Sequence, residues 1–110
     1  MFGLTSKGSI VGQLQRALAK RDVLAVRSFA GELPSVPLPI AAEITVLLLE
    51  REPESYAPAA RRLLARFASE RPMPLRQLAD VAALLANLEA DPAPAVAGKK
   101  LVSVIQRAVS

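Results

Sequence analysis

The stretch from Leu38 to Glu52, LPIAAEITVLLLERE, constrains the fold of this chain more than any other stretch. Placed on a helix at about 100° per residue, it has two apolar sides instead of one. Glu43 and Glu50 form one thin polar edge, and Thr45 and Glu52 form the other. A helix with two apolar sides is covered on both, so the pattern predicts a central helix. The residues expected to be almost fully buried are Ile44, Leu47 and Leu48 on one side and Val46 or Leu49 on the other.

Prolines divide the rest of the chain into further segments with helical periodicity. Ser9 is the expected N-cap of a first helix that runs to about Lys20, and Asp22 is the expected N-cap of a second. Pro53 ends the central helix, and Ser55 is the expected N-cap of the helix that follows. Two more helices are predicted over residues 75–89 and 95–109. Since no segment alternates with period two for long enough to form a strand, the sequence predicts an all-α protein with six helices.

Three blocks of sequence recur in the same order at nearly the same offset. The segment FAGELP at residues 29–34 matches FASERP at 67–72, a shift of 38. The segment LEREP at 49–53 matches LEADP at 88–92, a shift of 39, and AARRLL at 59–64 matches AGKKLV at 97–102, again at 38. A repeat of this length predicts three antiparallel helical hairpins, at about 9–33, 38–71 and 75–110, within a single domain of residues 1–110. The alternative is a compact six-helix bundle whose halves are similar by chance.

A hairpin period near 38 with an acid-proline turn resembles the α-solenoid repeats of the HEAT-like and TPR-like type. The nearest local match is Leu84-Leu85 followed by DPAPAV at residues 91–96, which is similar to the turn between the two helices of a HEAT repeat. The match departs from the HEAT pattern at Ala97, where an arginine is usual, and the small and aromatic positions of a TPR are not met. The resemblance implies an architecture, a short α-solenoid, and no particular family member or activity.

The chain lacks most of the residue types and motifs that usually carry out catalysis or bind metals. The chain has no cysteine and no histidine, and its five glycines are scattered instead of forming a phosphate-binding loop. We therefore expect no enzyme activity, no cofactor or metal, and no small-molecule substrate. No apolar run approaches the roughly 20 residues that a membrane span needs, and the N-terminus lacks the apolar core of a signal peptide. We expect a cytoplasmic protein without a membrane partner, and the excess of arginine over lysine and the many alanines suggest a bacterial source.

Positive charges are grouped in three stretches, at residues 61–76, 99–107 and 7–27. The chain carries a net charge of +4, and the repeat places Arg61-Arg62 and Lys99-Lys100 at equivalent positions of consecutive hairpins. Stacked hairpins would align these four residues in a basic ridge, with Arg66 on the same helix as the first pair. Basic side chains on the outer face of a helix most often serve only to keep it solvated. The candidate interaction surface is Arg61, Arg62, Arg66, Lys99 and Lys100.

Two classes of function follow from these patterns. The favoured class is a non-catalytic protein–protein interaction module, a small adaptor or regulator that binds another protein or a second copy of itself. The less favoured alternative is a nucleic-acid-binding protein that uses the basic ridge on phosphates. Single-stranded nucleic acid would also require exposed aromatic side chains, whereas Phe29, Tyr56 and Phe67 all lie on apolar stripes.

Overall fold

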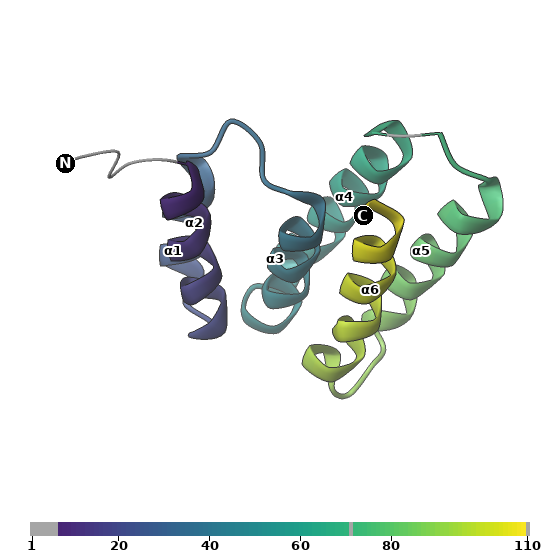
Figure 1. Cartoon of the computed structure of the whole chain (residues 1–110). Coiled ribbons are helices and arrows are strands. Elements are labelled where there is room, and N and C mark those ends of the chain that lie inside the picture. The colour runs from purple at the N-terminus through teal and green to yellow at the C-terminus, as the bar shows by residue number, and fades with distance from the viewer. Residues whose placement is uncertain (1–6, 71, 110) are drawn as a thin grey trace. The chain divides into compact units, whose positions relative to one another are not determined.

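The computed structural model describes residues 7–70 and 72–109, with side chains from Ile10 onward. Six α-helices follow one another along the chain (Figure 1), and no strand occurs in the described residues. Their bounds are α1 Lys7–Ala19, α2 Val23–Gly31, α3 Leu38–Arg51, α4 Tyr56–Glu70, α5 Leu75–Leu88 and α6 Pro94–Val109, with a short 3₁₀ turn, η1 Pro53–Ser55, before α4. The predicted all-α fold with six helices is confirmed.

The chain divides into two compact units, residues 1–37 and 38–110. The division falls between the first and second predicted hairpins, in the proline-rich segment that precedes α3. That residues 1–110 behave as one folding domain stays a prediction.

In the first unit, α1 packs against α2 across a turn of three residues. Arg21 has a φ of 57°, in the left-handed region, and donates its backbone N–H to the carbonyl of Leu18 while Asp22 donates to that of Ala17. This pair of bonds is a Schellman motif, which satisfies carbonyls at the end of α1. Asp22 then caps α2 as predicted, because its carboxylate accepts the N–H of Ala25 at 3.1 Å. One aspartate therefore ends one helix and begins the next.

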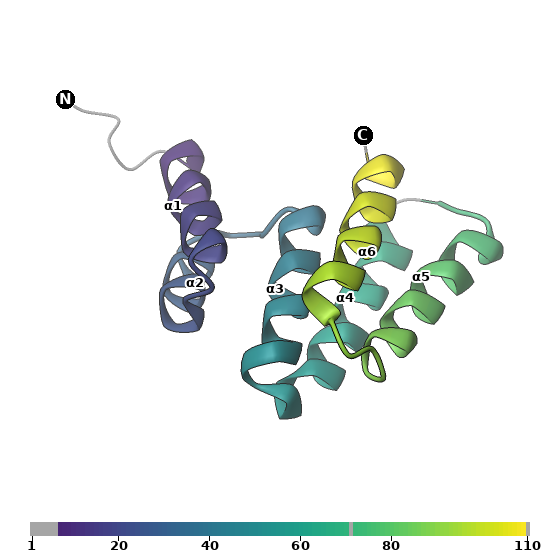
Figure 2. The same cartoon turned by 90° about the horizontal axis from the view of Figure 1, so that it is seen from below.

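In the second unit, α3, α4, α5 and α6 form a closed ring. Each packs against its neighbour in sequence, and α3 also packs against α6, which makes the most extensive contact of the ring. The two views agree that α5 lies on the side of α4 and α6 away from α3 (Figures 1 and 2). In a stack of hairpins, α3 would instead pack on α5 and α4 on α6. The ring is the arrangement of a four-helix bundle, and the resemblance to HEAT-like and TPR-like repeats stays a prediction.

A glycine permits the close contact between α3 and α6. Gly98 lies in α6 directly against Val46 of α3, and a methyl group at Gly98 would stand 2.7 Å from both Cγ atoms of Val46. Residues of all four helices fill the space inside the ring, and Tyr56, Phe67, Leu101 and Ile105 are the largest of its fully buried side chains. The ring thus closes around a continuous apolar core.

The central helix α3 is apolar on two sides, although not every expected residue is buried. Val46 belongs to the core of the ring, and Leu47 and Leu48 are also buried. Ile44 is only half-buried, so the expectation of nearly full burial was wrong there. Thr45 was placed on a polar edge but is buried, and its hydroxyl is satisfied by donating to the carbonyl of Ala41 at 2.8 Å. A threonine can be buried at this position because its hydroxyl bonds within its own helix.

The junction between α3 and α4 also differs from the prediction. Ser55 does not cap α4; its hydroxyl donates to the carboxylate of Glu52 at 3.2 Å, and η1 separates the two helices. Pro53 begins this turn, since its fixed φ suits a first helical position. As a result α4 begins at Tyr56. The Tyr56 side chain therefore lies at the end of the four-helix arrangement that is nearest this turn.

Candidate interaction surface

The five predicted site residues occupy α4 and α6. Arg61, Arg62, Lys99 and Lys100 are exposed, and Arg66 is half-buried. Both helices pack against α3 and against α5, so they occupy opposite corners of the ring. The pairs therefore do not stand side by side as the predicted ridge requires. Their role as an interaction surface stays a prediction.

Neighbouring bases on one helix also face different ways. Arg61 lines a groove between α4 and α5, and Lys100 lines another groove between α5 and α6. Arg62 follows Arg61 by about 100° around α4 and lines neither groove. Arg66 is already engaged, since its guanidinium donates to the carboxylate of Glu70 at 2.8 and 2.9 Å. Of the five predicted residues, Arg61 and Lys100 thus line grooves in the part of the chain that the structure describes.

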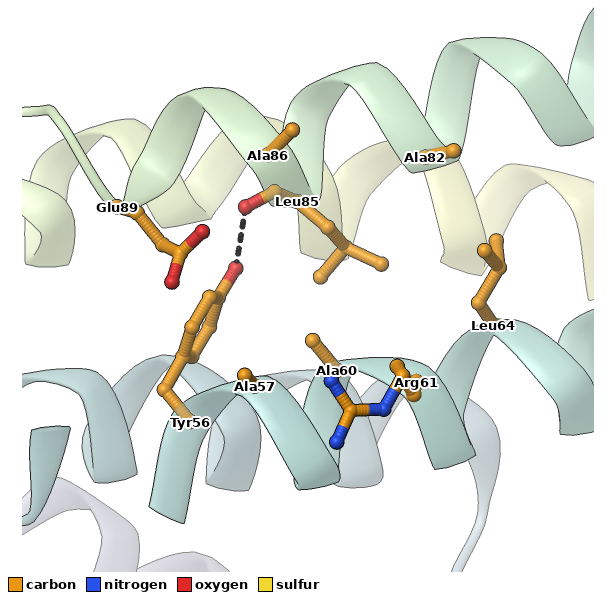
Figure 3. Close-up of a pocket in the computed structure, with 9 residues that line it drawn as sticks. All are labelled: Tyr56, Ala57, Ala60, Arg61, Leu64, Ala82, Leu85, Ala86 and Glu89. Carbon is orange, nitrogen blue, oxygen red and sulfur yellow. Dashed lines mark hydrogen bonds between the residues drawn. The ribbon is translucent and has the colours of Figure 1, made fainter. Parts of the chain in front are cut away.

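The first of these grooves lies between α4 and α5 (Figure 3). It has a volume of about 190 Å³ and lies along the seam where the two helices of the ring make their least extensive contact. Its walls combine small apolar side chains with three polar residues. The lining residues are Tyr56, Ala57, Ala60, Arg61 and Leu64 from α4 and Ala82, Leu85, Ala86 and Glu89 from α5. Four of the nine lining residues are alanines, whose side chains are short.

Tyr56 closes one end of this groove and ties its two walls together. Its side chain reaches from α4 to α5, where the phenol donates a hydrogen bond of 2.6 Å to the backbone carbonyl of Leu85 (Figure 3). Leu85 lies in the last turn of α5, where carbonyls lack the intrahelical donors of the helix interior. Tyr56 is only 1 % exposed. The groove therefore has a rigid end, fixed by a buried hydrogen bond.

The electrostatics at this end favour a neutral phenol. Burial, and after it the negative charge of Glu89, raises the pKa of Tyr56 from 10 to about 12. Both effects disfavour the phenolate, because it would be a second negative charge in a poorly solvated place. At neutral pH Tyr56 is protonated and serves as a hydrogen-bond donor. It is not a base or a nucleophile there.

Two opposite charges stand in the groove without partners. Arg61 from α4 and Glu89 from α5 are both exposed, and no hydrogen bond or ion pair joins either side chain to another of the residues that the structure describes. In Figure 3 the carboxylate of Glu89 lies beside the Tyr56 side chain, while the guanidinium of Arg61 lies farther along α4. A molecule in this groove would meet an acid at one end and a base nearer the middle.

The second groove, between α5 and α6, is similar in volume, about 190 Å³. Lys100 and Asp91 are its charged residues, and exposed Val96 adds an apolar rim. Asp91 is engaged in the turn before α6, where its carboxylate accepts the N–H of Ala93 at 2.8 Å. This groove therefore offers one unengaged charge, whereas the groove between α4 and α5 offers two.

Neither groove has the features of a small-molecule site. Pockets that enclose drug-sized ligands measure roughly 300–1,000 Å³, and each of these is smaller and open along the helix seam. Within residues 7–70 and 72–109, no group of three or more acidic side chains is placed to hold a metal ion. Among the helices described, none combines the length and apolar character needed to cross a bilayer.

The sequence analysis did not predict the α4–α5 groove, although the spacing of four alanines that line it can be seen in the sequence. Ala57 and Ala60 on α4 and Ala82 and Ala86 on α5 are spaced three and four residues apart, as small residues on one helix flank would be. This spacing indicates a groove only when α4 and α5 are known to pack against each other. The pairing of α4 with α5 is a property of the ring and is not encoded in either helix alone.

Comparison with models of known families, with curated proteins and with solved structures found no match to this chain.

Proposed function

We propose that this chain is a non-catalytic protein-interaction module, a small cytoplasmic adaptor or regulator, and that the groove between α4 and α5 is its binding surface. The observation that carries the proposal is the unpaired Arg61 and Glu89 in a groove floored by alanines. A helix with a base and an acid at matching positions would satisfy both charges. Its apolar side chains would fill the space left by the alanines, as in other recognition of helices by grooves.

The size of the groove supports a protein partner over a small ligand. A volume of about 190 Å³ accommodates a few side chains of a partner helix and leaves the rest of that helix on the outside. The rigid end at Tyr56 favours specific binding, because little conformational freedom is lost there when a partner docks. A bacterial source and a helical-repeat ancestry remain part of this proposal and rest on the sequence patterns alone.

Site-specific photo-crosslinking in the cells that make the protein tests this function. A photoreactive amino acid such as p-benzoylphenylalanine replaces Ala86, which is exposed and lines the groove, and in a control replaces Ser103, which is exposed on α6 outside both grooves. We expect a defined protein adduct, identified by mass spectrometry, at position 86 and none at position 103. Equal adducts at both positions, or none at position 86, would contradict the proposal.

The nucleic-acid alternative is the less favoured of the two, although Arg61, Arg62, Lys99 and Lys100 are exposed. Arg66 is paired with Glu70, and Arg61 shares its groove with the acidic Glu89. Phosphate binding depends on a net excess of positive charge along the contact surface. Glu89 reduces the excess of positive charge in the α4–α5 groove, where a nucleic-acid strand would have to bind.

A further inference from the structure

The positive charge of this chain is concentrated in its first, shorter unit. Residues 1–37 contain five basic and two acidic side chains, which gives a net charge of +3. Residues 38–110 contain nine basic and eight acidic side chains, which gives a net charge of +1. A local excess of this kind attracts acidic partners over distances up to the Debye length, roughly 10 Å at 0.1 M salt. The attraction for an acidic molecule therefore acts mainly through the first unit.

A groove between α1 and α2 contains two of these bases. It has a volume of about 240 Å³, and its walls include Arg16, Ala17 and Lys20 from α1 and Asp22, Ala25 and Phe29 from α2. Arg16 and Lys20 are four residues apart, so they stand on the same wall. Both are exposed, and no hydrogen bond or ion pair joins either side chain to another of the residues that the structure describes. The α1 wall thus presents two cations that have no partner there.

The acid that lines this α1–α2 groove is already engaged. Asp22 caps α2, since its carboxylate accepts the N–H of Ala25 at 3.1 Å, and no ion pair joins it to Arg16 or Lys20. Asp22 belongs to the turn of the hairpin, and Arg16 lies about one helical turn farther from that turn than Lys20. A carboxylate that avoids Asp22 is therefore best placed on Arg16, whose guanidinium can bond both of its oxygens.

Apolar side chains form the rest of the α1–α2 groove. Ala17 and Ala25 are short, and Phe29 is only half-buried. The volume of about 240 Å³ is below the roughly 300–1,000 Å³ of pockets that enclose drug-sized ligands. It suits one or two side chains of a larger molecule. The groove thus combines a place for an acidic side chain with a place for an apolar one beside it.

We propose that the α1–α2 groove binds an acidic segment of a partner protein, with a carboxylate on Arg16 and Lys20 and a neighbouring apolar side chain against Phe29. All of these residues belong to the first unit, so the inference does not depend on the α4–α5 groove. A nucleic-acid strand suits the α1–α2 groove less well, because every nucleotide carries a charge and some would meet Asp22. A peptide can place an uncharged residue there.

Titration of the isotope-labelled full chain with a short peptide, followed by nuclear magnetic resonance, tests the proposal. The probe is the capped peptide GEELEEG, whose acids on both sides of leucine allow either chain direction. Exposed ion pairs are individually weak, so we expect a dissociation constant on the order of 1 mM. The backbone amide signals that move should be those of α1 and α2 around the groove, and added salt should weaken the binding.

Two control peptides separate the acidic from the apolar contribution. The peptide GQQLQQG keeps the leucine and loses the charges, whereas GEESEEG keeps the charges and loses the leucine. Each should bind at least about threefold more weakly than GEELEEG, because one lacks the ion pairs and the other lacks the buried apolar side chain.

The double variant Arg16→Gln/Lys20→Gln removes both cations of the groove and should weaken the binding of GEELEEG by about threefold to tenfold. Arg51→Gln/Arg76→Gln is the matched control, since it removes the same charge from two exposed residues that do not line the groove. We expect this control to bind within about twofold of the wild type. The melting temperatures of both variants should stay within a few degrees of the wild type, because all four side chains are exposed.

Several results would overturn the proposal. These are the absence of any change in the spectrum at about 5 mM GEELEEG, changes that persist unaltered in Arg16→Gln/Lys20→Gln, or equal binding of GQQLQQG. Oligothymidine that moves the same signals at a lower concentration would overturn the choice of a protein partner. Crosslinking at position 86 reports on the α4–α5 groove alone, so a failure of the proposed function and a failure of this inference are recognised separately.

Discussion

The phenol of Tyr56 donates a hydrogen bond of 2.6 Å to the backbone carbonyl of Leu85, and this single contact ties the start of α4 to the last turn of α5. The two residues are 29 positions apart in sequence. Both are buried, so the bond is shielded from water. It lies at the end of the groove that we assign to protein binding, and it fixes the distance between the two walls there.

Removal of the Tyr56 hydroxyl tests this contact. In Tyr56→Phe, the ring still fills its place in the core but the carbonyl of Leu85 loses its donor. We expect a loss of about 1–3 kcal/mol in the free energy of unfolding, the usual cost of leaving a buried polar group unsatisfied. Urea denaturation followed by circular dichroism measures it. A stability equal to that of the wild type would mean that water or another donor replaces the phenol.

The pKa of Tyr56 can be followed without interference, because Tyr56 is the only tyrosine and the chain has no tryptophan. Absorbance of the phenolate should report an apparent pKa of about 12. In Glu89→Gln the pKa should fall but stay above 10, since a nearby negative charge is removed while burial, the larger cause of the shift, remains. Asp80→Asn, an equivalent change on the same helix at an exposed position outside the groove, is the control and should leave the titration unchanged.

The same shift predicts how stability depends on pH at the alkaline end. The pKa of Tyr56 is higher in the folded chain than in the unfolded one, so the folded state binds its proton more tightly. The resulting stabilisation is fully present below pH 10 and is lost as the pH rises through about 12. We expect the free energy of unfolding to fall across this window in the wild type and to fall less in Tyr56→Phe. Equal slopes in the two proteins would contradict the assignment.

The contact between Gly98 and Val46 gives a sharp test of ring closure. In Gly98→Ala the new methyl group would stand 2.7 Å from both Cγ atoms of Val46 and must force α3 and α6 apart. We expect a loss of about 1–3 kcal/mol in the free energy of unfolding, as for other overpacked cores.

A second background serves as the control for this substitution. In Val46→Ala the two Cγ atoms are gone, so Gly98→Ala should there cost nothing or gain about 0.5–1 kcal/mol from its better helix propensity. The coupling of the two sites in a double-mutant cycle measures the clash itself. Additive effects would show that the helices already stand farther apart than the structure indicates.

The basic residues give the test of the nucleic-acid alternative. We expect no binding of duplex DNA or of single-stranded nucleic acid by the wild type at physiological salt, measured by fluorescence anisotropy. If Arg61, Arg62, Lys99 and Lys100 did bind duplex phosphates, the slope of log K against log salt should change by about 0.9 for each contact removed. A micromolar, salt-sensitive complex that is lost when all four are neutralised would reverse our order of the two functions. Arg66 is the internal control, since Glu70 already pairs with it.

The sequence by itself determined the helices of this protein. Their periodicity, the prolines between them and the N-cap at Asp22 are local signals, because a helix is built from bonds between residues three and four apart. For this reason the bounds of α3 and α5 agree with prediction to within a residue at their ends. The prediction from local sequence was wrong where a side chain had two possible hydrogen-bond partners. Ser55 was expected to cap α4, but its hydroxyl donates to the carboxylate of Glu52 instead.

Only the tertiary structure decided which helices are neighbours. The repeat suggested that equivalent helices stack, whereas α3 packs on α6 and α4 on α5. An apolar stripe predicts that one face of a helix is buried, but it does not predict which helix packs against that face, since burial of apolar surface is non-directional. The choice depends on details such as the missing side chain at Gly98 and the reach of Tyr56 to Leu85. The α4–α5 groove, with its unpaired Arg61 and Glu89, exists only because of that choice.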